Sequence, residues 1–313
     1  MKILWLSKIE TNKNWGCERF YKTAFENKNI FTVDVDYQVN RGVLLKAVPN
    51  GYYDGTIIQR GTGYILPKYV IKKLPRPRVL LFTELVIRHP NQHYLFDEDL
   101  FDFFLIRGTN CLKILTGKFN IDISKIQIHL SAATPFKGNT VYKERNMKPV
   151  FIGSLTPRRK NMLSGMESNI DVLSLFGDEM LEELRRRQFV LNIHAEDYID
   201  TETRVFEVFS AGSTLITEQL GLECPFIKNK DYIVFNNKEQ LKEIINDLKT
   251  ISPKQYKNQI LVDHNYHNRV EQIIKIIRSE GFFRKNEFKN PFFSEFIEWF
   301  LLKFKSIKQK IKT

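Results

Sequence analysis

Residues 189–217 read FVLNIHAEDYIDTETRVFEVFSAGSTLIT and predict one unit of an α/β domain. The apolar run 189–193 predicts a buried strand, and 197–203 predicts a loop rich in helix-capping side chains. Residues 204–211 predict a short helix that a glycine ends, and 213–217 predict the next strand. A strand, a helix and a second strand in this order are typical of a parallel sheet with helices on its faces.

Three polar residues of this segment are candidates for ligand binding: His194, Arg204 and Glu207. Open α/β sheets bind ligands beyond the carboxyl ends of their strands, and a helix N-terminus at that edge favours anions. His194 follows the first predicted strand, and Arg204 and Glu207 lie in the first turns of the helix. The segment therefore predicts a site for a phosphorylated ligand.

The composition is that of a folded intracellular protein. A chain of 313 residues with 42% hydrophobic content can form one large domain or two ordinary ones. Cys17, Cys111 and Cys224 are widely separated, which indicates neither a zinc cluster nor a disulfide framework and favours a reducing compartment. The apolar segment 1–7 is too short for a signal peptide, and no run of eighteen apolar residues occurs. We therefore expect a cytoplasmic location.

Alternating strand and helix patterns divide the chain into two parts. Predicted strands lie at 2–6, 31–37, 55–59, 78–83, 103–106 and 126–130, and then at 149–153, 170–177, 189–193, 213–217 and 232–235. Such alternation favours parallel sheets with right-handed crossovers. We expect an N-terminal Rossmann-like domain over 1–140, a C-terminal Rossmann-like domain over 149–280 and a separate tail over 281–313.

Six short segments carry a family resemblance. They are VFIGSLTPRR at 150–159, LFG at 175–177, LNIH at 191–194, TRVFE at 203–207, AG at 211–212 and HNYHNR at 264–269. The series resembles the CgeB-like, spore-maturation-type glycosyltransferases of the GT-B fold. The resemblance implies an α/β protein of two facing Rossmann-like domains with parallel sheets, in which the second domain holds a nucleotide-sugar donor and an acceptor approaches from the first.

The resemblance also implies roles for single residues. Related GT-B enzymes carry a glutamate that hydrogen-bonds the donor ribose, and the matching position is Glu207. A larger retaining group has a further glutamate eight positions earlier, where this chain has Ile199. Asp200 and Glu202 are nearby acids out of register with that position, so the stereochemical outcome stays open.

Three consecutive cations, Arg158, Arg159 and Lys160, follow the predicted strand 149–153 in what we expect to be a loop. Cationic side chains at this edge can neutralise a donor diphosphate and the charge that develops on the leaving group. This arrangement needs neither a metal ion nor a cofactor, and we expect neither. An exposed basic turn is the alternative reading of the same residues.

Arg204 and His194 each have two readings. Arg204 either faces phosphate or pairs with Glu207, and His194 either donates to phosphate or ends the strand.

In the first domain, Glu84 and His89 follow the predicted strand 78–83 and are candidates for the general base that an inverting transfer needs. The alternative for both is a solvated loop.

The tail 291–313 has the pattern of a basic amphipathic helix, with Phe and Ile at helical spacing and lysines elsewhere. Residues 281–313 hold eight Lys or Arg against three Glu, a charge of +5 within the chain's +12. Such a helix fits an anionic membrane surface. Packing of the tail against the first domain is the alternative.

Taken together, these observations predict a peripheral membrane glycosyltransferase. The expected reaction moves a sugar from a nucleotide-diphosphate donor to a surface-polysaccharide or lipid-linked glycan acceptor. The alternative is a non-catalytic relative that binds a nucleotide sugar or glycan. No nucleic acid partner is expected, because the basic residues gather in an amphipathic tail rather than among aromatics on a sheet face.

Overall fold

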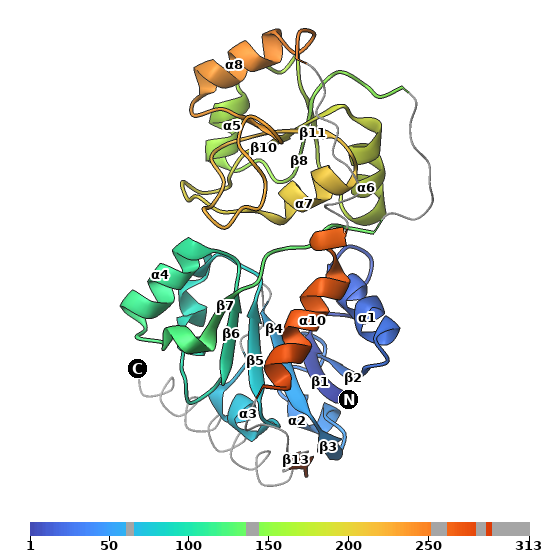
Figure 1. The fold of residues 1–313 in the computed structure, drawn as a ribbon, viewed down its shortest axis with the longest axis vertical. Helices are drawn as coiled ribbons and strands as arrows, with labels where there is room; N and C mark the ends of the chain where they lie inside the picture. Colours follow the sequence, from blue (N-terminus) through green and yellow to red (C-terminus); the bar gives the residue numbers. More distant parts are fainter. Residues whose placement is uncertain (61–65, 136–143, 252–261, 280–285, 290–313) are drawn as a thin grey trace, which may run out of the picture.

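The computed structural model describes residues 1–60, 66–135, 144–251, 262–279 and 286–289. Figure 1 shows two α/β domains, one above the other, with the N-terminal domain below. Each domain is built on one parallel sheet with helices packed on its faces. The predicted tail helix 291–313 lies outside the described residues. Within the described ranges, no helix is both long enough and apolar enough to cross a membrane.

The first domain contains a six-stranded parallel sheet in the order β2-β1-β4-β5-β6-β7. Its strands are β1 (Lys2–Ser7), β2 (Phe31–Asp36), β4 (Gly55–Arg60), β5 (Arg78–Phe82), β6 (Phe103–Ile106) and β7 (Ile126–Ile128). Its helices are α1 (Glu18–Asn27), α2 (Leu44–Ala47), α3 (Lys68–Lys73) and α4 (Thr109–Lys118), with the 3-10 turns η1 (Val86–Arg88), η2 (Pro90–Leu95) and η3 (Ile123–Lys125). A small antiparallel pair joins β3 (Gly51–Tyr53) to β13 (Asn286–Phe288).

The second domain contains a five-stranded parallel sheet in the order β12-β11-β10-β8-β9. Its strands are β8 (Val150–Ile152), β9 (Asp171–Leu173), β10 (Phe189–Asn192), β11 (Thr214–Thr217) and β12 (Ile233–Val234). The helices that follow in the chain are α5 (Pro157–Leu163), α6 (Gly177–Arg186), α7 (Thr203–Ser210), α8 (Lys238–Asn246) and α10 (Tyr266–Ile277).

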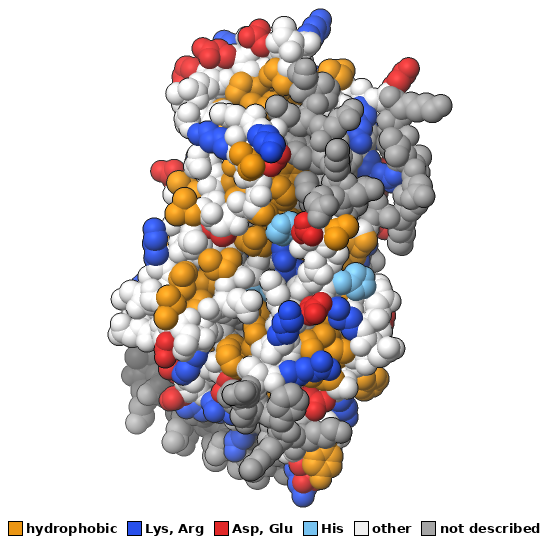
Figure 2. Space-filling view, in the orientation of Figure 1, with side chains coloured by type: hydrophobic (Ala, Val, Ile, Leu, Met, Phe, Trp, Pro, Cys, Tyr) orange, Lys and Arg blue, Asp and Glu red, His pale blue; other side chains and the backbone are white. Residues whose placement is uncertain are grey.

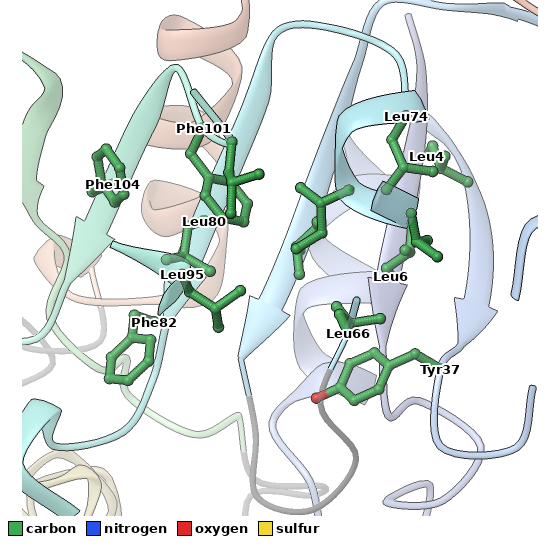
Figure 3. Packing of buried hydrophobic residues seen from close by; sticks show 14 of the residues in the cluster. Leu4, Leu6, Tyr37, Leu66, Leu74, Leu80, Phe82, Leu95, Phe101 and Phe104 are labelled. Atoms are coloured by element: carbon green, nitrogen blue, oxygen red, sulfur yellow. The ribbon is translucent and has the colours of Figure 1, made fainter. Parts of the chain in front are cut away.

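The central strands of both sheets are buried on both faces, which explains why they are nearly continuous apolar runs. Successive side chains point to opposite faces of a strand, so Leu4 and Leu6 of β1 pack in one cluster and Ile3 and Trp5 in another. Figure 3 shows the first cluster, where Leu4 and Leu6 share one layer with side chains of β5 and β6. These layers make each sheet a rigid base for the loops at its carboxyl edge.

The final described helix, α10, crosses from the second domain to the first. Its residues Val270, Ile273 and Ile277 are buried in the cluster that also holds Ile3 and Trp5 of β1. Figure 1 shows it running across the lower domain beside α1. The sequence division at 149–280 assigned this helix to the second domain, whereas its apolar face covers the first sheet.

Two segments differ from the sequence prediction. Residues 157–163 form helix α5 rather than a loop: Thr156 accepts a hydrogen bond from the Arg159 amide at the N-cap, and Pro157 occupies the first turn. The predicted strand 170–177 is shorter, because β9 ends at Leu173 and α6 begins at Gly177. Gly177 has a φ of 59° and its Cβ position would lie 2.4 Å from the Asn14 carbonyl oxygen, so only glycine fits there.

Candidate functional site

A cavity of about 470 Å³ lies where the carboxyl edges of the two sheets meet. Its volume is in the range of small-molecule sites. The second domain supplies most of the wall, from the segments after β8 and β10 and from the start of α7. The first domain supplies Leu85 and Arg88 after β5 and Arg107 directly after β6. The cavity therefore depends on both domains.

Arg159, Arg204 and Glu207, three of the six predicted donor-binding residues, line this cavity. The Arg159 guanidinium donates to the Ile193 carbonyl at 2.8 Å and to the Ser154 carbonyl at 3.1 Å, and it lies over the Phe151 ring. Burial lowers the pKa of Arg159, which nevertheless stays a cation at neutral pH. These bonds hold the guanidinium at the wall in a fixed orientation.

Arg204 and Glu207 lie one turn apart on α7 and form an ion pair, with Arg204 Nη1 and Glu207 Oε2 separated by 3.0 Å. Arg204 also donates to the Ile152 carbonyl at 3.3 Å. The pairing with Glu207 is therefore present, and because Arg204 also lines the cavity, its contact with phosphate stays a prediction. The pair gives the cavity one cationic and one hydrogen-bond-accepting group side by side.

The other three predicted donor-binding residues lie outside the cavity wall. Arg158 forms a bidentate ion pair with Glu218, in which Nη1 lies 2.8 Å from Oε2 and Nη2 lies 2.5 Å from Oε1. It also donates to the His194 carbonyl. Lys160 is exposed on α5. Three consecutive helical residues project about 100° apart, so one turn sends them to three different environments.

His194 is buried behind the wall, between the second-domain segments that surround β10 and β11. Its Nε2 lies 3.0 Å from the Gln219 carbonyl oxygen, and its Nδ1 lies 3.6 Å from Glu202 Oε1. Burial alone would lower the pKa of His194, but the neighbouring Glu202 carboxylate raises it overall. His194 therefore lies directly behind a carboxylate of the wall.

Four carboxylates and four arginines line the cavity. The acids are Glu196, Asp200, Glu202 and Glu207, and the arginines are Arg88, Arg107, Arg159 and Arg204. The sequence prediction did not include Arg88 and Arg107. Arg107 directly follows a strand of the sheet, as His194 nearly does, and that position was a usable signal.

Two of these pairs cross the domain boundary. Arg88 holds Glu196 with two bonds of 2.8 Å and 2.6 Å, and Arg107 pairs with Asp200 at 3.1 Å. Near them, Glu223 of the second domain accepts hydrogen bonds from the Thr109 amide and hydroxyl at the start of α4. The loop between β10 and α7 is thus bonded to the first domain.

Glu84 and His89, the two candidates for the acceptor side, lie near the cavity but not in its wall. Glu84 Oε2 is 3.3 Å from Arg88 Nη1, so it shares that cation with Glu196. His89 lies between the turns η1 and η2. Their assignment to catalysis stays a prediction.

Comparison with known proteins gives the fold and a family match over part of the chain. Residues 158–275 match the family model described as glycosyl transferase-like. HepE of Anabaena, solved with UDP-glucose, is 11% identical, with 89% of this chain and 100% of that chain covered at a TM-score of 0.57. WaaG, a glycosyltransferase involved in lipopolysaccharide biosynthesis, is 11% identical. The match covers 88% of this chain and 100% of that chain at a TM-score of 0.53.

The chain has the GT-B fold. A third GT-B structure, an alpha-glucosyltransferase in complex with UDP and DNA, is 13% identical, with coverage of 88% and 99% at a TM-score of 0.57. No relative was found among the curated proteins. Within this GT-B chain the matched segment 158–275 begins in α5 and spans α7, so it contains Arg159, Arg204 and Glu207. The predicted fold is confirmed.

Proposed function

We propose that this chain transfers a sugar from a nucleotide-diphosphate-sugar donor to a surface-polysaccharide or lipid-linked glycan acceptor, as in the CgeB-like glycosyltransferases that its motifs resemble. The observation that carries the proposal is the convergence of Arg159, Arg204 and Glu207 on one cavity between two sheets. The titles of similar structures name UDP-glucose and UDP as ligands of those proteins, which supports a nucleotide-linked donor here.

In this proposal the donor diphosphate lies against Arg159 and Arg204. A guanidinium presents several N–H groups in one plane and binds phosphate oxygens in pairs. The same two cations stabilise the negative charge that builds up on the nucleoside diphosphate as it leaves, without a metal ion. Glu207 accepts hydrogen bonds from the two ribose hydroxyls, because an ionised carboxylate only accepts.

The acceptor enters from the first domain in this proposal. Glu84 and His89, beyond β5, are the groups proposed to take the proton of the acceptor hydroxyl if the transfer inverts the sugar. The basic tail 291–313 is proposed to hold the enzyme at the anionic inner face of the cell membrane, where a lipid-linked acceptor is displayed. Deletion of 291–313 should abolish sedimentation with phosphatidylserine vesicles and leave donor binding unchanged.

The deciding experiment is a thermal-shift and hydrolysis screen against UDP-, GDP-, dTDP-, ADP- and CMP-sugars. We expect one nucleotide family to raise the melting temperature of the wild type and to be slowly hydrolysed. Glu207→Ala should remove most of this shift, whereas Glu239→Ala, an acidic residue on α8 away from the cavity, should not.

Two outcomes would change the proposal. Binding without any turnover, with or without an added glycan, would favour the non-catalytic relative. No response to any nucleotide sugar would contradict the transferase and favour a non-catalytic relative that binds a glycan.

A further inference from the structure

Glu202 differs from the three other acids of the cavity wall because no arginine lies as close to its carboxylate. Glu196, Asp200 and Glu207 each have an arginine nitrogen within 3.1 Å. The nitrogen atoms that face Glu202 lie farther away, at 3.6 Å for His194 Nδ1 and 3.9 Å for Arg159 Nη2. Its oxygens therefore keep capacity to accept hydrogen bonds from a ligand in the cavity.

The Glu202 carboxylate lies against a histidine that is itself fixed by hydrogen bonds. Glu202 precedes α7 in extended backbone, and its side chain makes no capping bond to that helix. Behind it, His194 is fixed by its contact with Gln219, and the His194 amide donates to Glu218 at 2.7 Å. Burial would raise the pKa of Glu202, but His194 and the two neighbouring arginines lower it overall, so it is ionised.

We propose that Glu202 binds hydroxyl groups of the transferred sugar and makes the cavity select an uncharged sugar over a uronic acid. This inference rests on the proposed function. An ionised carboxylate only accepts hydrogen bonds, so the ligand group against it must be a donor. Sugar hydroxyls donate, whereas phosphates and sugar carboxylates at neutral pH only accept.

The charges of the wall lead to the same conclusion. The four arginines are matched in number by four carboxylates, and the donor diphosphate already draws on Arg159 and Arg204. A second anion at the sugar end would meet Glu202 with no further arginine of the wall to offset it. Like charges at this range disfavour each other, and a tenfold preference for the neutral sugar corresponds to about 1.4 kcal/mol.

The test is isothermal titration calorimetry with UDP, UDP-glucose and UDP-glucuronic acid, and with GDP, GDP-mannose and GDP-mannuronic acid. Each sugar pair differs only at C6. We expect the wild type to bind the neutral-sugar nucleotide at least about tenfold more tightly than the uronic acid. Glu202→Gln should bring the two affinities within about threefold and leave the affinity for the nucleoside diphosphate unchanged.

Glu239→Gln is the matched control, because it changes a carboxylate on α8 that does not line the cavity. It should keep the wild-type preference. Glu202→Asp is a second variant that retains the charge but retracts it, and it should weaken binding of the neutral-sugar nucleotide without improving binding of the uronic acid.

Three results would overturn the inference while leaving the proposed function intact. They are equal affinities for the two sugars in the wild type, an equal loss of nucleoside diphosphate binding in Glu202→Gln, and a Glu239→Gln effect as large as that of Glu202→Gln. If neither UDP nor GDP compounds bind, the proposed function fails for those donors and the inference fails with it.

Discussion

At the residue scale, neighbouring cations of one helical turn have different surroundings. Arg158, Arg159 and Lys160 carry the same charge in the sequence, yet Arg158 is paired with Glu218, Arg159 lines the cavity and Lys160 is exposed. The difference follows from the helical rotation of about 100° per residue. Which of the three reaches a ligand depends on the sheet against which α5 packs.

Arg159→Ala should lower the affinity for the nucleoside diphosphate by about ten- to a hundredfold, since a hydrogen bond to a charged group contributes about 1.5–3 kcal/mol. Lys160→Ala should leave this affinity unchanged. Arg158→Ala should instead lower the free energy of unfolding, because it leaves the partly buried Glu218 without its cation. Calorimetry and urea denaturation of the three variants check this division, which equal effects at all three positions would contradict.

His129 gives a prediction about pH. It is buried with its Nε2 2.9 Å from the Tyr21 hydroxyl, and burial together with the charge of Arg269 lowers its pKa from 6.5 to about 3. The unfolded chain therefore binds a proton below pH 6.5 that the folded chain does not. The contribution of His129 to the free energy of unfolding is therefore fully present above pH 6.5. It is lost as the pH falls, and the loss is about 2 kcal/mol at pH 5.

His129→Gln keeps an amide that can bond Tyr21 but removes the titration. Between pH 7 and pH 5 the wild type should therefore lose about 2 kcal/mol more unfolding free energy than the variant. Urea denaturation at each pH measures the difference, and parallel pH curves would show that His129 does not titrate as expected.

At the scale of elements, α10 connects the end of the second domain to the first sheet. Its apolar stripe, in which Val270, Ile273 and Ile277 are buried, packs against α1 and β1. Figure 2 shows charged side chains of both signs on the face of the first domain where α10 lies, so its outward side is solvated. The helix thus contributes to the core of a domain that precedes it by more than a hundred residues.

Ile273→Ala should lower the free energy of unfolding by about 2–5 kcal/mol, because Ile273 is fully buried and its removal leaves a cavity. Lys275→Ala on the same helix should change it by less than about 0.5 kcal/mol, since its side chain is 77% exposed. Chemical denaturation followed by far-UV circular dichroism compares the two. A small loss for Ile273→Ala would mean that α10 is not part of the cooperative core.

At the scale of the molecule, the two domains meet through ionic contacts that also form the cavity wall. Arg107 and Asp200 are 12% and 3% exposed and belong to different domains. Removing one partner of a buried pair leaves an uncompensated charge and costs about 3–5 kcal/mol. Domain contact and cavity shape are therefore expected to change together.

Arg107→Ala should lower the unfolding free energy by about 3 kcal/mol, and Arg107→Ala/Asp200→Ala should recover part of that loss. Small-angle scattering should show a larger radius of gyration for the single variant, because the domains lose a contact that holds them together. Additive effects of the two substitutions would show that the pair does not couple.

Several features were predictable from the sequence alone because they depend on neighbouring residues. Apolar runs predicted the strands of both sheets, and 189–217 predicted the order β10, α7 and β11, with Glu207 on the helix. Thr156 followed by Pro157 was a usable signal for the start of α5 that the loop prediction overlooked. Local propensity and periodicity act within a few residues, so they can be read without the fold.

Only the tertiary structure decided which side chains share the cavity. Arg88 and Arg107 meet Glu196 and Asp200 across about a hundred residues of chain, and Glu202 rather than Asp200 is left without a close arginine. These outcomes depend on how two separately folded sheets face each other, and such long-range geometry arises from the packing of whole surfaces. The sequence by itself determined most of the elements and the GT-B class, and the packing of the two domains determined the site.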